Sequence, residues 1–254
     1  MSYTQSASIL APALIIYVID ISKSMNDACG GTTKLGLVDA ALAATIDDMV
    51  RRSMRDGMLQ RRYKIALFTY NGTVHDVLHG IHDVADVVQQ GLPTLSGSGH
   101  SDTVGAFTAV AELVQSHLHE FQESPAPLIC HFTDGHFTTG DPTPLVKRMR
   151  AMHVADGAVL VQHVYLADNM LKRPVQDWQH WSGVTKRGSL ADDYARFLYT
   201  LASPMPESYR QNINYYGYHL EPGAALLFQG TQRAMICLSF PVASATDLRA
   251  PNRP

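Results

Sequence analysis

Four apolar runs of strand length, separated by segments with helical periodicity, constrain the fold of this chain more than any other feature. The runs are ALIIYVID (13–20), YKIALFTY (63–70), LICHFTD (128–134) and AVLVQHVYLA (158–167). Each run is apolar almost throughout, which is typical of a strand covered on both faces. The clearest segments with helical spacing lie at 34–56, 104–121, 143–153 and 190–202. This alternation predicts an α/β fold with a mainly parallel sheet and helices on both of its faces.

A turn signal follows the second apolar run. Asn71 and Gly72 lead into TVHDVLHG, which predicts a tight hairpin to an antiparallel strand. The segment DVADVVQQ (83–90) then predicts a short helix. One antiparallel strand is therefore expected at an edge of the sheet.

The alternation of apolar runs and helical segments ends at Pro204. Pro204 and Pro206 close the last helix, and a tyrosine-rich link, NINYYGYHL, follows. AALLFQG and RAMICLSFPV then predict a strand pair, and the tail DLRAPNRP is expected to be disordered. Because exposed apolar strands aggregate, we expect this extension to pack against its own domain; the alternative is that a partner covers it. Aromatic residues are expected to supply the covering surface, namely Trp178, Trp181, Tyr209, Tyr215, Tyr216 and Tyr218.

Composition argues against several classes of protein. The formal net charge is −3 and there is no basic stripe, so we expect no nucleic-acid partner. No stretch of about 18 uninterrupted apolar residues exists, which argues against a membrane span. The N-terminus has no basic region before an apolar core, so we expect no signal peptide and predict a cytoplasmic protein. Cys29, Cys130 and Cys237 lie far apart without a CxxC pair, and Cys130 and Cys237, which sit inside apolar runs, are expected to be reduced, buried thiols.

Three oxygen-bearing side chains follow the first apolar run at alternate positions: Asp20, Ser22 and Ser24. Asp134 ends the third run in the same way, and HSDT (100–103) leads into the next helix. In a parallel open sheet, ligands bind beyond the carboxyl ends of the strands, where these residues are expected. Two carboxylates with hydroxyls from the loops make an oxygen-only set. Such a set suits Mg²⁺ or Mn²⁺ rather than zinc, because no cysteine or histidine belongs to it.

Each of these residues also has an ordinary structural interpretation. Ser24 or Asp27 is a candidate helix cap, as is Ser101 or Asp102 for the helix that follows. Asp134 followed by glycine is a common turn pair. The order of the three motifs on successive strand ends of the predicted fold favours the metal site.

The motifs resemble the metal-ion-dependent adhesion site of the von Willebrand factor type A (vWA) domain. The family's first motif, Asp-x-Ser-x-Ser, is met by Asp20, Ser22 and Ser24. Its third motif, an aspartate followed by glycine at a strand end, is met by Asp134.

The family's second motif normally offers a threonine. Ser101 takes that position here, and Thr103 is the alternative ligand or a residue that orients one. The resemblance covers roughly residues 10–203 and leaves 204–254 as a C-terminal extension. It implies a Rossmann-like vWA fold with a mainly parallel six-stranded sheet and one antiparallel edge strand.

The resemblance implies a metal-dependent protein–protein interaction module. Mg²⁺ prefers about six oxygens, so three hydroxyls and two carboxylates leave a position for an Asp or Glu of a protein partner. Mn²⁺ and Ca²⁺ are the alternative ions. Without a signal peptide, the chain looks like the intracellular bacterial branch of the family, such as the tellurite-resistance-associated members. Those members imply an adaptor in a stress or defence system, with a kinase, phosphatase, protease or AAA+ ATPase as partner.

Two alternatives stay open: a metal-dependent hydrolase or phosphatase, and a scaffold that does not use the metal. The chain lacks a second aspartate two residues after Asp20, and it has no GxSxG, HExxH or phosphate-binding glycine loop. We therefore expect no enzyme. His100 and His136 are expected at the rim of the site, and His131 is expected in the core.

Overall fold

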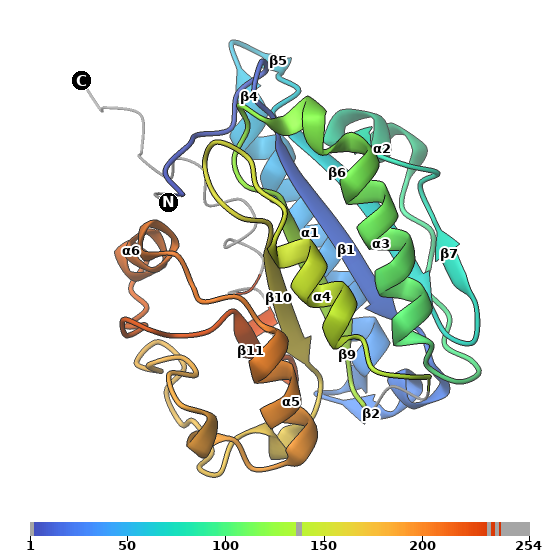
Figure 1. Ribbon diagram of the computed structural model, residues 1–254, viewed down its shortest axis with the longest axis vertical. Helices are drawn as coiled ribbons and strands as arrows, with labels where there is room; N and C mark the ends of the chain where they lie inside the picture. Colours follow the sequence, from blue (N-terminus) through green and yellow to red (C-terminus); the bar gives the residue numbers. More distant parts are fainter. Residues whose placement is uncertain (1–2, 136–138, 233–234, 237–238, 240–254) are drawn as a thin grey trace.

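A mainly parallel sheet forms the centre of the protein (Figure 1). The computed structural model describes residues 3–135, 139–232, 235–236 and 239. In these residues the strand order is β11-β10-β9-β1-β6-β7, and β8 also pairs with β6. The parallel strands are β1 (Ala13–Asp20), β6 (Tyr63–Tyr70), β9 (Leu128–Thr133), β10 (Leu160–Tyr165) and β11 (Leu227–Gln229). The α/β fold class predicted from the apolar runs is confirmed.

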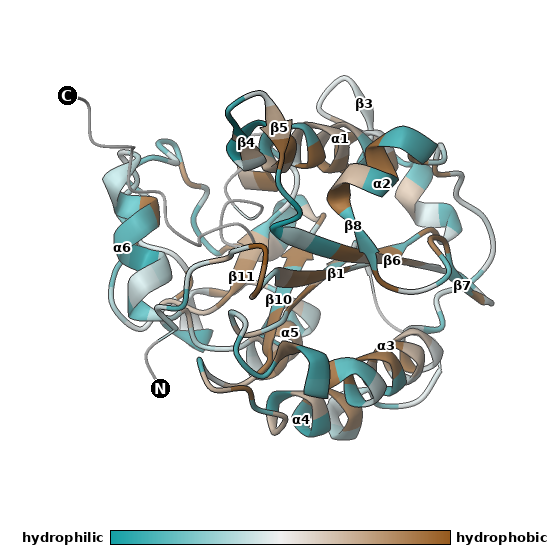
Figure 2. Cartoon of the chain, turned by 90° about the horizontal axis from the view of Figure 1, so that it is seen from above, coloured by the Kyte–Doolittle hydropathy of each residue, from teal (hydrophilic) through white to brown (hydrophobic). Residues whose placement is uncertain are grey.

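Helices cover both faces of the sheet (Figure 2). One face carries α1 (Lys34–Ser53) and α2 (Val84–Gln90), and the other carries α3 (Thr103–His117) and α4 (Thr143–Arg150). The residues of β1 alternate between two hydrophobic clusters, Ile15, Tyr17 and Ile19 in the first and Leu14, Ile16 and Val18 in the second. A strand buried on both faces needs apolar side chains at every position, which explains the continuous apolar run.

The antiparallel edge of the sheet consists of two short strands, where one was predicted. β7 (Val74–Asp76) pairs with the end of β6, and β8 (His82–Asp83) pairs with its beginning. Between them the chain turns away from β6, with positive φ at His79 and Gly80. The described sheet therefore has seven strands rather than six. The predicted hairpin at Asn71 is confirmed, since Thr73 N donates to Asn71 Oδ1 at 3.0 Å.

The C-terminal extension differs from the predicted link and strand pair. After α5 (Asp193–Leu201), a helix, α6 (Glu207–Tyr215), forms where a link was expected. β11 pairs with β10 in parallel. Met235 and Ile236, inside that expected strand, have helical backbone. Most of the remaining expected strand and the whole tail lie outside the described residues.

The extension packs against the main body of the chain, as predicted. Tyr209, Ile213 and Phe228 belong to the same hydrophobic cluster as one face of β1. Trp181 meets Phe228 edge to face at 6.1 Å between ring centroids. Tyr215 and Tyr216 differ from the expected covering aromatics, because they are 74% and 50% exposed. The boundary at residue 203 stays a prediction.

Short elements complete the described fold. They are the hairpins β2 (Ala28–Cys29) with β3 (Thr32–Thr33) and β4 (Met54–Arg55) with β5 (Met58–Leu59), and the 3₁₀ helices η1 (Lys23–Asn26), η2 (Leu118–Phe121), η3 (Asp168–Met170) and η4 (Arg187–Ser189). Across the described residues, every helix is too short or too polar to span a lipid bilayer.

Candidate functional site

The carboxyl ends of β1 and β9 bring the two strand-ending aspartates together. The parallel register pairs Ile19 with Phe132, so Asp20 and Asp134 leave the sheet at the same edge. A cavity of about 520 Å³ opens there. Its lining residues are Asp20, Ser22, Lys23, Ser24, Gly99, His100, Ser101, Asp134 and Gly135. All five of the first-choice metal ligands predicted from the sequence therefore line one cavity.

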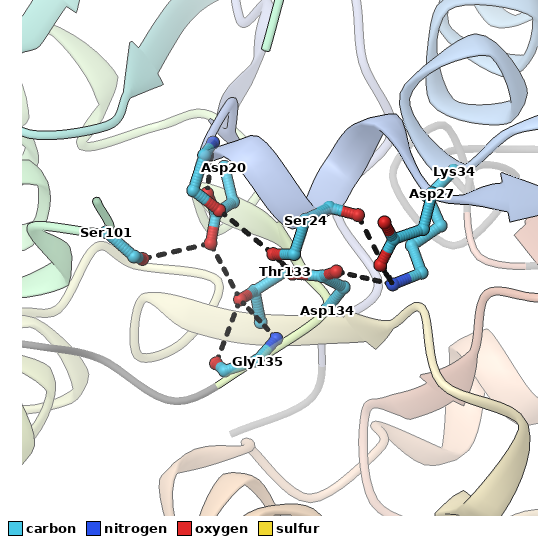
Figure 3. Close-up of polar contacts among 9 residues, drawn as sticks. Asp20, Ser24, Asp27, Lys34, Ser101, Thr133, Asp134 and Gly135 are labelled. Carbon is cyan, nitrogen blue, oxygen red and sulfur yellow. Dashed lines mark hydrogen bonds and ion pairs between the residues drawn. The ribbon is translucent and has the colours of Figure 1, made fainter. Parts of the chain in front are cut away.

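Asp20 is held by three hydrogen-bond donors. Its Oδ1 accepts from the backbone N–H of Ser22 at 2.8 Å, and its Oδ2 accepts from the hydroxyls of Ser101 and Thr133, each at 3.0 Å (Figure 3). The residue is only 1% exposed. Burial raises the pKa of Asp20, and the hydrogen bonds from Ser22, Ser101 and Thr133 oppose that rise. The carboxylate is thus fixed in one orientation before any ligand arrives.

Ser22 and Ser24 contribute hydroxyls from the turn after β1. Ser22 stands at the N-cap of η1, but its side chain makes no capping hydrogen bond. Its Oγ lies 3.4 Å from the Oγ of Ser24, which donates to Asp134 Oδ1 at 2.8 Å. Helix α1 is capped by Thr33, whose side chain accepts from the backbone N–H of Gly36, so the helix-cap interpretation does not account for Ser24.

Three consecutive residues at the start of α3, Ser101, Asp102 and Thr103, have different roles. Asp102 caps α3, because its Oδ1 accepts from the backbone N–H of Gly105 at 3.0 Å. Ser101 lines the cavity and donates to Asp20. Thr103 is the first residue of α3 and is 1% exposed. Its Oγ1 lies 3.5 Å from the Ser101 Oγ, and its side chain also makes a hydrogen bond with Tyr70.

Lys34 is the member of the site that the sequence motifs did not reveal. Its Nζ donates to Asp134 Oδ2 at 2.6 Å, to Asp27 Oδ2 at 3.2 Å and to the backbone carbonyl of Ser24 at 3.3 Å (Figure 3). The side chain of Asp134 is 2% exposed, and that of Lys34 is 17% exposed. Burial lowers the pKa of Lys34, but the hydrogen bonds and charges of Asp134 and Asp27 raise it by more than burial lowers it. The net shift of the pKa is upward. Lys34 is therefore an ammonium ion at neutral pH.

The three histidines near this edge have separate environments. His100 lines the cavity, as expected, whereas His136 lies outside the described residues. His131 is fully buried, with Tyr70 Oη at 2.7 Å and His163 Nδ1 at 2.9 Å. Burial lowers the pKa of His131 to about 3. The prediction that His131 is a core residue is confirmed, because it is neutral and saturated with partners.

Three oxygen pairs of the site can be compared with the spacing of ligands around a small dication. Adjacent ligands of an octahedral Mg²⁺ lie about 2.9 Å apart, because each oxygen is about 2.0–2.1 Å from the ion. The oxygen pairs Ser24–Asp134, Ser101–Asp20 and Ser22–Ser24 are 2.8, 3.0 and 3.4 Å apart. Within the described residues, no three His, Cys, Asp or Glu side chains are placed to hold a metal together. Hydroxyl oxygens would therefore have to complete a coordination shell, and the residues present fit a hard divalent cation.

The sequence of the sheet and site segment matches a known family model. The match is to the von Willebrand factor type A domain and spans residues 15–136. The matched range includes all three motifs that line the cavity, namely those at Asp20, Ser101 and Asp134. Among curated proteins, none matches this sequence.

Solved structures resemble this chain at low sequence identity. Proximal thread matrix protein 1 from the mussel byssus aligns with a TM-score of 0.52 and 14% identity, over 94% of this chain and 49% of that chain. The vWF domain of the type V pili tip protein Mfa5 from Porphyromonas gingivalis aligns with a TM-score of 0.39 and 19% identity, over 50% and 39%. The PilB minor pilin from Streptococcus sanguinis aligns with a TM-score of 0.39 and 13% identity, over 50% and 30%. The aligned part spans less than half of each of these proteins, and the mussel protein supports the fold alone.

Two site residues were missed from the sequence, for different reasons. Thr133 was treated as part of the buried strand, although it ends β9 and donates to Asp20. Lys34 is the first residue of α1, where the helix dipole disfavours a cation. A lysine at that position is the signal that could have indicated a nearby carboxylate.

Proposed function

We propose that this vWA domain is a protein-interaction module that binds a divalent cation at Asp20, Ser22, Ser24, Ser101 and Asp134. Domains of this family are interaction modules, which supports a protein partner. The observation that carries the metal-dependent part is the convergence of these five side chains on one cavity at ligand-like spacing.

The chain's own residues would divide the work as follows. Ser22, Ser24 and Ser101 supply uncharged oxygens, and the two aspartates neutralise a dication. Asp20 is oriented by its three donors, so it does not have to reorganise when a cation enters. A bound ion would supply an electrophilic centre that accepts one more oxygen ligand.

A carboxylate of the partner is the ligand that this site favours. Two aspartates and three hydroxyls leave a dication short of its preferred six oxygens, so an Asp or Glu of the partner can complete the coordination. Mg²⁺ suits the cluster best, and Mn²⁺ comes next. Ca²⁺ is larger and prefers more ligands than the cluster offers, so it should substitute less well.

The cellular setting is part of the same proposal. We propose a cytoplasmic adaptor of a bacterial stress or defence system, similar to the tellurite-resistance-associated members of the family. A kinase, phosphatase, protease or AAA+ ATPase is the kind of partner that such systems contain.

The enzyme and scaffold alternatives make different demands on the site. A hydrolase needs a general base in the cavity, and His100 is the histidine that lines it among the described residues. No observation favours His100 in that role, so we propose a function without catalysis. A scaffold that does not use the metal would not need the oriented carboxylate of Asp20.

Partner capture from native lysate tests the proposal. The tagged protein is incubated with Mg²⁺, with EDTA, or with Mg²⁺ after the change Asp134→Ala, and Asp47→Ala serves as a matched control. Asp47 is an exposed aspartate of α1 about 20 Å along the helix from Lys34. We expect a specific partner in the Mg²⁺ and control arms and its loss in the other two. Equal capture in all four arms would contradict a metal-dependent interaction.

A further inference from the structure

The ammonium group of Lys34 lies where a second cation would compete with a metal. It is 2.6 Å from Asp134 Oδ2, while the other oxygen of that carboxylate accepts from Ser24. Each oxygen of the Asp134 carboxylate therefore already has one partner within the chain. Its side chain is 2% exposed, so this carboxylate depends on Lys34 for a counter-charge.

Lys34 is tied to the same turn that carries the serine ligands. Beyond Asp134, it donates to Asp27 and to the backbone carbonyl of Ser24, and the Lys34 backbone N–H donates to the Asp27 carbonyl at 3.0 Å. One side chain thus links the start of α1, the turn after β1 and the end of β9. Lys34 is the first residue of α1, where the helix dipole disfavours a positive charge. Its contacts with Asp134 and Asp27 offset that unfavourable interaction.

We propose that Lys34 is a built-in cation that occupies Asp134 in the metal-free protein and must leave it before a divalent cation binds. This inference rests on the proposed metal site and adds a regulation to it. A dication and an ammonium ion a few ångströms apart repel each other, so both cannot share Asp134 without a cost. Lys34 then sets the threshold concentration of metal at which the site becomes competent.

The inference predicts opposite effects of one substitution on stability and on metal affinity. In Lys34→Met, Asp134 keeps its buried position but loses its counter-charge, so the apparent Tm in EDTA should fall. The same variant should bind Mg²⁺ about 10- to 100-fold more tightly than the wild type, because the competing charge is gone. Added Mg²⁺ should therefore raise the Tm of Lys34→Met more than that of the wild type.

The experiment is Mg²⁺ titration by calorimetry, with melting curves in EDTA and in Mg²⁺, on the full chain. Lys147→Met is the matched control, because Lys147 is an exposed lysine of α4 and is not among the residues that line the cavity. Lys34→Arg keeps the charge and should keep the Mg²⁺ affinity of the wild type. Lys34→Gln, whose amide can still donate to Asp134, replaces Lys34→Met if that variant folds poorly.

Three outcomes separate this inference from the proposed function. Tighter Mg²⁺ binding in Lys34→Met, with Lys147→Met close to the wild type, supports it. Equal or weaker binding in Lys34→Met beside measurable binding in the wild type overturns the inference and leaves the metal site standing. Absence of Mg²⁺ binding in every variant overturns both.

Discussion

Ser101 and Asp102 are adjacent in the chain but serve different purposes. The Ser101 hydroxyl faces the cavity and donates to Asp20, whereas the Asp102 carboxylate accepts from Gly105 and caps α3. The sequence offered both residues as candidate helix caps. Only the hydrogen bonds of the folded chain show that Asp102 is the cap and that Ser101 is not. A residue type shared by helix caps and metal ligands leaves that choice open until the neighbours are known.

This difference predicts two separable phenotypes. Ser101→Ala should weaken Mg²⁺ binding by at least about tenfold, because it removes a ligand oxygen and a donor to Asp20. Asp102→Ala should leave Mg²⁺ affinity unchanged and lower the free energy of unfolding by about 1 kcal/mol through loss of the cap. Calorimetry and urea unfolding measure the two effects.

Thr103→Ala completes that comparison. Thr103 makes a side-chain hydrogen bond with Tyr70, and its Oγ1 lies 3.5 Å from the Ser101 hydroxyl, so we expect Thr103 to orient a ligand. The substitution Thr103→Ala should therefore weaken Mg²⁺ binding less than Ser101→Ala does. A larger loss for Thr103→Ala would show that Thr103 is the ligand.

Among the elements, the C-terminal strand and helix were the hardest to predict. β11 pairs with β10, whose residues lie about 60 positions earlier, and sequence alone does not distinguish this partner from a neighbouring strand. α6 buries only Tyr209 and Ile213, so its apolar periodicity is too weak to stand out beside its tyrosines. The main strands were predicted closely, since β1 and β6 coincide with their apolar runs.

Two aromatic residues of the extension test its packing. Phe228 on β11 is 1% exposed and contacts Trp181, whereas Tyr215 at the end of α6 is 74% exposed. Phe228→Ala should lower the free energy of unfolding by about 3–5 kcal/mol, and Tyr215→Ala should change it by less than about 0.5 kcal/mol. Chemical unfolding measures both. Equal, small effects would mean that the extension does not stabilise the domain.

At the scale of the whole molecule, the parallel sheet explains why residues 114 positions apart share one cavity. β1 and β9 are neighbours and run in the same direction, so Asp20 and Asp134 emerge at one edge. The periodicity of the sequence predicts this edge, because strand type and direction follow from local patterns. The ion pair between Lys34 and Asp134 spans 100 residues and depends on where α1 begins, which no local pattern encodes.

Titration of Mg²⁺ into the purified protein tests the central claim most directly. We expect saturable binding to the wild type, a loss of at least about tenfold in affinity for Ser22→Ala and for Asp134→Ala, and no change for Asp47→Ala. Circular dichroism spectra should be the same for all four proteins, because these side chains lie at strand ends, turns or the surface. The same Mg²⁺ affinity in all four proteins, or no saturable binding to the wild type, would contradict a metal site at this edge of the sheet.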